Sequence, residues 1–186
     1  MQKIARRALV ASGVALLCFT AQAWAQEPMR VRGTVEAMDG AMYVVKTRSG
    51  DTVKVALTDK PLFVAMAKVS MADIKPGMFV GTTALPQADG SLRAVEVHIF
   101  PEAMRGTGEG HQPWDLVPNS TMTNAAVAQM VKAVDGDEIT VKYKGGEKKI
   151  VVLPQTRIVT FVPGDKSELK PGVKIFIAAA RKKDAS

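Results

Sequence analysis

The sequence contains the same arrangement of motifs twice. A Val-x-Ala-x-Asp-Gly motif occupies residues 35–40 and returns at residues 131–136, after 96 positions. A Leu/Ile-Lys-Pro-Gly motif occupies residues 74–77 and returns at residues 169–172, after 95 positions. Two copies of one unit at a nearly fixed spacing predict two similar folded modules, and they constrain the architecture more than any local propensity does.

The first copy, residues 29–100, has the pattern of short β-strands. Polar and apolar side chains alternate from Arg30 to Ala37, which is the two-residue period of a half-buried strand. Asp39-Gly40 is typical of a tight hairpin turn, and Ser70 with Asp73 predicts a short capped helical turn. The strands expected in this copy cover residues 30–37, 43–47, 52–57, 62–64, 78–85 and 92–100.

The second copy, residues 125–183, repeats this scheme but contains no counterpart of the strand at 92–100. Five or six short antiparallel strands bury one face when they close into a small barrel, and closure also removes the exposed edges. We therefore expect a mostly β protein with two tandem small OB-like β-barrels joined by a Gly/Pro-containing linker. The missing strand predicts a free edge at residues 173–180, covered by the linker or another chain.

Residues 1–25 have the features of a signal peptide. Lys3, Arg6 and Arg7 form a basic start, residues 8–20 are apolar, and Ala23-Trp24-Ala25 has the small-x-small form of a cleavage site. The apolar segment is shorter than the roughly 20 residues needed to span a bilayer. The expected protein is periplasmic, cleaved after Ala25 and without stable membrane insertion after cleavage.

Removal of residues 1–25 lowers the net charge and removes the only cysteine, which excludes some classes of function. Three basic and no acidic residues are lost, so the net charge falls from +7 to +4. That excess is too small for a nucleic-acid-binding surface. Cys18, the only cysteine, is also lost, which leaves neither a disulfide nor a thiolate metal site.

The linker, residues 101–124, is the strongest candidate for a functional site because neither copy contains a similar segment. Three glycines and three prolines suit a loop held in one shape, whereas flexible spacers are richer in Gly and Ser and lack a large aromatic residue. The candidate ligand-binding residues are Arg105, Glu109, His111, Trp114 and Asp115.

Two interpretations of this cluster remain open. In the first, Trp114 fills a gap between the two barrels and the charged residues pair with one another, as an interdomain clasp. In the second, a cleft between the barrels binds a ligand or partner, with Arg105 and His111 as polar contacts and Trp114 as an apolar wall. Glu109 and Asp115 would then orient those groups or bind a cation.

Two further functions are alternatives. A small hydrolase would use His111 as a general base oriented by Glu109 or Asp115, although no nucleophile motif accompanies it. A copper-handling protein would use His98, His111 and methionine thioethers, which are soft ligands. The methionines are scattered, however, and methionine is also an adaptable core residue.

The combination of Gly33 and Val35 in a strand, a Gly-containing hairpin and a Leu/Ile-Lys-Pro-Gly turn resembles a family of exported bacterial small-barrel domains of unknown function. The linker segments 105–111 and 113–115 resemble a signature of its two-barrel members. The resemblance covers nearly the whole chain after residue 25. It implies the fold and the compartment, and it brings no activity, cofactor or catalytic residue.

These observations lead to one expected function. We expect a periplasmic, non-enzymatic binding or scaffold protein whose site lies at the linker, with no catalytic residue, no metal and no cofactor. Its partner would be an envelope protein or a small ligand, and not a nucleic acid.

Overall fold

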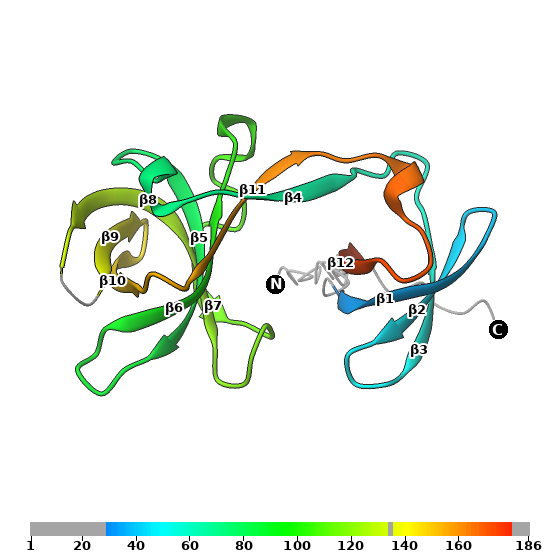
Figure 1. Cartoon of the computed structure of the whole chain (residues 1–186), viewed down its shortest axis with the longest axis horizontal. Coiled ribbons are helices and arrows are strands. Elements are labelled where there is room, and N and C mark those ends of the chain that lie inside the picture. Colours follow the sequence, from blue (N-terminus) through cyan, green and yellow to red (C-terminus); the bar gives the residue numbers. More distant parts are fainter. Residues whose placement is uncertain (1–28, 134–135, 180–186) are drawn as a thin grey trace, which may run out of the picture.

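The computed structural model describes residues 29–133 and 136–179 of the chain (Figure 1). This part is mostly β, with two sheets and three single 3-10 turns. The strands are β1 (Met29–Asp39), β2 (Met42–Thr47), β3 (Thr52–Ala56), β4 (Val64–Lys68), β5 (Phe79–Pro86), β6 (Leu92–Ile99), β7 (Gly110–Pro113), β8 (Thr121–Val131), β9 (Asp137–Tyr143), β10 (Gly146–Val152), β11 (Arg157–Pro163) and β12 (Lys174–Ala179). The turns are η1 (Met71–Asp73), η2 (Glu102–Met104) and η3 (Lys166–Glu168).

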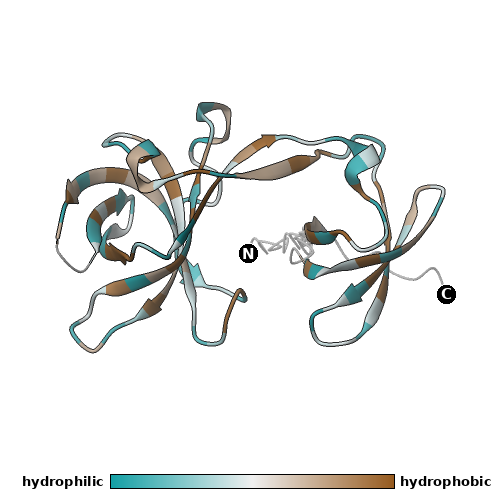
Figure 2. Cartoon of the chain, viewed as in Figure 1, coloured by the Kyte–Doolittle hydropathy of each residue, from teal (hydrophilic) through white to brown (hydrophobic). Residues whose placement is uncertain are grey.

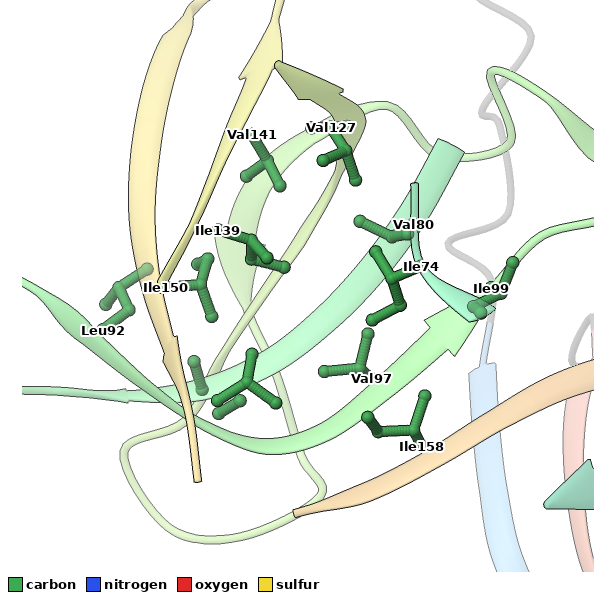
Figure 3. Close-up of a cluster of buried hydrophobic side chains, with 14 residues drawn as sticks. Ile74, Val80, Leu92, Val97, Ile99, Val127, Ile139, Val141, Ile150 and Ile158 are labelled. Atoms are coloured by element: carbon green, nitrogen blue, oxygen red, sulfur yellow. The ribbon is translucent and has the colours of Figure 1, made fainter. Parts of the chain in front are cut away.

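One sheet closes into a five-stranded barrel. Its strands pair in the order β10-β9-β8-β5-β6, and β6 returns to β10 through a parallel pairing of Leu92 with Ile150. Apolar residues recur along these strands (Figure 2), and in β5 every residue from Phe79 to Ala84 is buried. The inward side chains form one core in which Ile139, Val141 and Ile150 are fully buried (Figure 3). The prediction of a small β-barrel is confirmed for this part of the molecule.

The second sheet is open and has the order β12-β1-β2-β3. Its core is small, with Val31, Val35, Tyr43 and Val45 as the buried side chains. Within residues 29–133 and 136–179, no strand connects β3 to β12. The expectation of a second closed barrel is therefore not confirmed. We call this four-stranded unit the open sheet.

The two halves of the chain exchange strands. β5 pairs with β8 of the second half, and β12 returns to pair with β1 of the first half. The two junctions have matching hydrogen bonds, because Gly77 N donates to Val127 O and Gly172 N donates to Val35 O, both at 2.8 Å. Each glycine ends one of the two Lys-Pro-Gly motifs. The two motifs therefore make the same hydrogen bond, each to a strand from the other half of the chain.

This exchange differs from the expected division of the chain into barrels at residues 29–100 and 125–183. β5 and β6 lie before the linker, yet they form part of the same barrel as β8, β9 and β10. The open sheet likewise combines residues from both ends of the described chain. The physical reason is that β8 and β1 offer equivalent edges, so the repeat pattern alone does not specify which edge receives which strand.

Two strands carry the chain between the sheets. β4 pairs antiparallel with β11, and Met66 lies opposite Phe161 at the centre of that pairing. These residues are 95 positions apart, the same spacing as the two Lys-Pro-Gly motifs. Figure 1 shows the paired strands running side by side between the barrel and the open sheet. Their pairing joins the two crossing segments and so supports the exchange.

The register also corrects the alignment of the two copies. Val35 precedes a bulge in β1 and pairs with Val45, and Val127 precedes the matching bulge in β8 and pairs with Val141. Val35 therefore corresponds structurally to Val127 rather than to Val131. The Val-x-Ala-x-Asp-Gly match is an alignment of sequence, and the paired strands β1 and β8 are offset from it by four residues.

Candidate functional site

The first part of the linker is fixed to the barrel. The Arg105 guanidinium donates to both carboxylate oxygens of Glu102, at 2.5 and 2.8 Å, and to the carbonyl of Gly77 at 3.0 Å. Gly77 is the last residue of the first Lys-Pro-Gly motif, next to the exchanged strand β5. Arg105 therefore anchors the linker at the strand junction, and we assign it a structural role.

Glu109 and His111 also contact the barrel. A Glu109 carboxylate oxygen accepts a hydrogen bond from the backbone N–H of Lys144 at 3.0 Å. His111 lies in β7, and its Nδ1 is 2.8 Å from the hydroxyl oxygen of Thr123, which is fully buried. Burial, and to a smaller extent the charge of Lys148, lowers the pKa of His111. Neither Glu109 nor Asp115 orients His111, which removes the contact that the hydrolase alternative requires.

The rest of the linker reaches the open sheet. The Asp115 carboxylate accepts two hydrogen bonds from Arg32 of β1, both at 3.2 Å. Trp114 lies beneath the Arg30 guanidinium, 4.2 Å from the ring centroid, and its ring is 6.2 Å from that of Phe176 in β12. Trp114 thus spans β1 and β12, the two strands joined by the exchange, and this geometry agrees with the clasp interpretation.

A cavity of about 470 Å³ lies beside this contact. Three arginines and one carboxylate line it: Arg30 and Arg32 from β1, Arg48 from the turn between β2 and β3, and Asp115 from the linker. Arg48 donates to the carbonyl of Leu116 at 2.9 Å. We call this cavity the arginine pocket. The other residues that line it are Met29, Val31, Thr47, Ser49 and Val53.

The predicted cluster of five linker residues is therefore divided between two places. Asp115 lines the arginine pocket and Trp114 lies against its arginines, whereas Arg105, Glu109 and His111 make their contacts on the barrel. The expectation of one cleft lined by all five is not supported by these contacts. Sequence reasoning missed the three arginines. Arg30 and Arg32 were recognisable only as the polar face of a strand, because the linker and the turn at Arg48 meet them through the fold.

A second polar cluster joins β6 to β11. Glu96 is buried, one of its oxygens is 2.7 Å from Nε2 of His98, and the other accepts a hydrogen bond from Arg157. Burial acts to raise the pKa of Glu96, but the interactions with His98 and Arg157 outweigh it and hold the pKa below its ordinary value. The cluster is a stabilising contact between the barrel and a crossing strand.

The metal alternative gains no support from this cluster. Among residues 29–133 and 136–179, no group of three or more His, Cys, Asp or Glu side chains is placed to hold an ion. His98 instead contacts Glu96 and stacks edge-on against Phe161, with ring centroids 5.3 Å apart.

Glu96→Gln tests the stabilising role through its pH dependence. A carboxylate with a depressed pKa stabilises the fold above its unfolded pKa, and that contribution is lost as the pH falls through the folded pKa. We expect the variant to lose about 1–2 kcal/mol at pH 7, the range for a hydrogen bond to a charged group discounted for the exposure of Arg157. The loss should shrink toward zero in acid, as measured by urea unfolding from pH 7 to pH 3.

The matched control is Glu147→Gln, which alters an exposed carboxylate paired with Lys142. It should change stability little at any pH. A loss for Glu96→Gln that stays constant down to pH 3 would show that packing, rather than the carboxylate charge, explains the effect.

The chain matches no protein-family model, no curated protein and no solved structure. In the part of the chain that the structure describes, no helix has the length and apolarity that a membrane crossing requires.

Proposed function

We propose that this protein is an exported, non-enzymatic binding protein that holds an acidic group of a ligand or envelope protein in the arginine pocket. The composition of the pocket carries the proposal, since three guanidinium groups meet only one carboxylate there. Guanidinium groups bind carboxylates and phosphates through paired, charge-assisted hydrogen bonds. The excess of positive charge therefore favours an anionic ligand.

The position of Trp114 supports the same proposal. Cations above an indole ring gain from its negative face, and here the Arg30 and Arg32 guanidinium groups lie 4.2 and 5.5 Å from the ring centroid. The ring restricts the positions of the two side chains, so the pocket is organised before a ligand enters. Preorganised side chains lose less conformational entropy on binding.

The contacts of His111 support binding over hydrolysis. The hydroxyl within its reach belongs to Thr123, whose burial keeps a substrate from approaching it. A nucleophile must reach the reacting carbon, and a general base must reach the nucleophile in the same complex. His111 is better explained as the residue that fixes β7 to β8.

The proposed compartment rests on residues 1–25, which lie outside the residues that the structure describes. Their basic start, apolar segment and Ala-Trp-Ala site predict cleavage after Ala25. The processed chain then contains Trp114 as its only tryptophan. Its fluorescence reports directly on the arginine pocket.

Citrate, a tricarboxylate, is the probe for this proposal. Titration of the processed protein with citrate at constant ionic strength is expected to change Trp114 emission saturably, because the anion alters the arginines above the ring. Arg48→Gln should weaken citrate binding about tenfold, equivalent to about 1.4 kcal/mol and close to the lower end of the contribution of one hydrogen bond to a charged group.

The control variant Lys142→Gln removes the same charge from β9 of the barrel, where Lys142 is exposed. It should leave the citrate affinity unchanged. Equal weakening by both variants would mean that citrate responds to net charge alone, and a wild-type protein without saturable response would contradict the proposed pocket.

A further inference from the structure

We propose that the open sheet binds an extended segment of a partner protein as an added strand between β12 and β3. This inference goes beyond the arginine pocket, because it concerns the edges of the sheet and does not need the pocket to be occupied. The barrel in the same chain shows what the complete unit contains, and the open sheet lacks one strand of that unit.

Hydrogen-bond registers identify the corresponding strands. β12 pairs with β1 as β5 pairs with β8, with Lys174 opposite Thr34 and Phe79 opposite Ala126. β3 follows β2 as β10 follows β9. In the barrel, β6 lies antiparallel to β5, and its other edge pairs in parallel with β10 at Leu92 and Arg93 and with β11 from Glu96 to Ile99. The corresponding position beside β12 and β3 holds no strand in the part of the chain that the structure describes.

Exposure of the inner residues of β3 agrees with a missing neighbour. Val55 lies opposite Tyr43 and corresponds to Ile150, which lies opposite Ile139. Ile150 is fully buried in the barrel, whereas Val55 is only half-buried. The next inner residue, Leu57, is likewise half-buried and packs at the margin of the small core.

The inner residues of β12 show the same difference. Ile175 and Ile177 correspond to Val80 and Thr82 of β5, and both of those are fully buried between β8 and β6. Ile175 and Ile177 remain half-buried. Apolar residues on the inner side of both edges are thus left partly open to solvent, where the barrel uses β6 to cover them. A strand added here would bury apolar surface on both sides of the gap.

The geometry selects the kind of occupant. A segment that fills the gap needs both of its edges free, because it must bond to β12 on one side and to β3 on the other. Each of the twelve described strands already pairs with at least one neighbour, so a folded second copy offers none of them as such a segment. The occupant is therefore an extended, otherwise unpaired segment of another protein, bound by β-strand addition.

The pattern of β6 gives the expected side chains of the occupant. Four apolar residues of this eight-residue strand enter the barrel core: Leu92, Ala94, Val97 and Ile99. The outer side chains of the occupant should be acidic, since Lys54 of β3 and Lys174 of β12 are exposed on the two edges and Arg48 lies in the turn before β3. The same lysines disfavour pairing with the equally basic edge of a second copy.

Two synthetic peptides test the proposal. The first has the sequence of residues 92–100, and the second carries Arg93→Glu and His98→Glu so that its outer face is acidic. Hydrogen exchange of the full processed protein is measured with each peptide at saturating concentration. We expect the acidic peptide to slow exchange at least tenfold in both β12 and β3, and to bind more tightly than the first. The barrel strands should be unaffected.

A control peptide carries Val97→Pro in the acidic sequence, which removes a backbone donor and breaks the extended ladder. It should give no protection. Equal protection by this peptide, or protection of neither edge by the acidic peptide, would overturn the proposal. Protection of β12 without β3 would also overturn it, because the segment would then extend one edge without filling the gap.

Two measurements without peptide exclude other occupants. Protection of β12 that rises with protein concentration would identify a second copy as the occupant and overturn the proposal. Protection that disappears when the chain is shortened after Ala179 would identify residues 180–186 as the occupant, with the same consequence. Citrate binding to the arginine pocket is measured in the same samples, so a failed strand proposal remains distinguishable from a failed pocket.

Discussion

Ile150→Ala is expected to lower the free energy of unfolding by about 2–5 kcal/mol, whereas Ile177→Ala should lower it by only about 1–2 kcal/mol. Both changes remove the same atoms. Ile150 is fully buried where β10 meets β6, so its truncation leaves a cavity in a closed core. Ile177 is half-buried at the edge of the open sheet, and solvent reaches the space that truncation leaves.

Urea unfolding of the two variants measures this difference. The control is Leu62→Ala, which shortens a side chain that is 82% exposed and should change stability by less than about 0.5 kcal/mol. Equal losses for Ile150→Ala and Ile177→Ala would mean that Ile177 is packed as tightly as the barrel core. In that case the gap between β12 and β3 would be filled within the protein itself.

Much of the local structure could be predicted from the sequence. The strands expected at residues 78–85 and 92–100 are found as β5 and β6, with boundaries displaced by a residue at most. The expected capped turn is η1, where the Asp73 carboxylate accepts a hydrogen bond from the backbone N–H of Ser70 at 2.8 Å. These features depend on alternation and on turn residues, which act over a few positions.

The free edge was also predictable, because the second copy contains no counterpart of β6. β12 has β1 as its neighbour on one side, and none of the described strands pairs with its other side. The linker or another chain was expected to cover that edge, and the linker does not cover it. Instead, Trp114 packs against Phe176, an outward residue of β12, and leaves the hydrogen-bonding edge open to an added strand.

The strand exchange could not be predicted from the residues. The two Lys-Pro-Gly turns make matching hydrogen bonds at Gly77 and Gly172. Each exchanged strand would therefore find an equivalent strand to pair with in its own half of the chain. Sequence alternation specifies which face of a strand is buried, but it does not choose between two equivalent edges. The choice depends on the crossing pair β4–β11, whose centre is Met66 opposite Phe161.

The residues of the candidate site were not predicted correctly from the sequence, for a related reason. Glu109, His111 and Asp115 are close in sequence. Because β7 pairs with β8, Glu109 and His111 contact the barrel, whereas Asp115 follows β7 and contacts β1 of the open sheet. The arginines that accompany Asp115 come from β1 and from the turn at Arg48, more than sixty residues away along the chain. Residues that are close in sequence therefore need not belong to one site when a short strand fixes some of them elsewhere.

The closed barrel, the open sheet and the gap all follow from the exchange of strands. A pair of cysteines distinguishes the exchanged fold from an unexchanged one. In the exchanged fold Thr34 lies opposite Lys174, while in an unexchanged fold Lys174 would lie opposite Ala126. Directly opposed residues of antiparallel strands have Cα atoms about 4.5–5.5 Å apart, within the range that a disulfide spans.

The measurement compares two variants of the processed protein, residues 26–186, whose sequence contains no other cysteine. Thr34→Cys with Lys174→Cys is expected to form an intramolecular disulfide in the monomer on mild oxidation, leaving no thiol for maleimide. Ala126→Cys with Lys174→Cys should keep both thiols. Crosslinking of the second pair without the first would contradict the exchanged fold, and with it the open sheet on which strand binding depends.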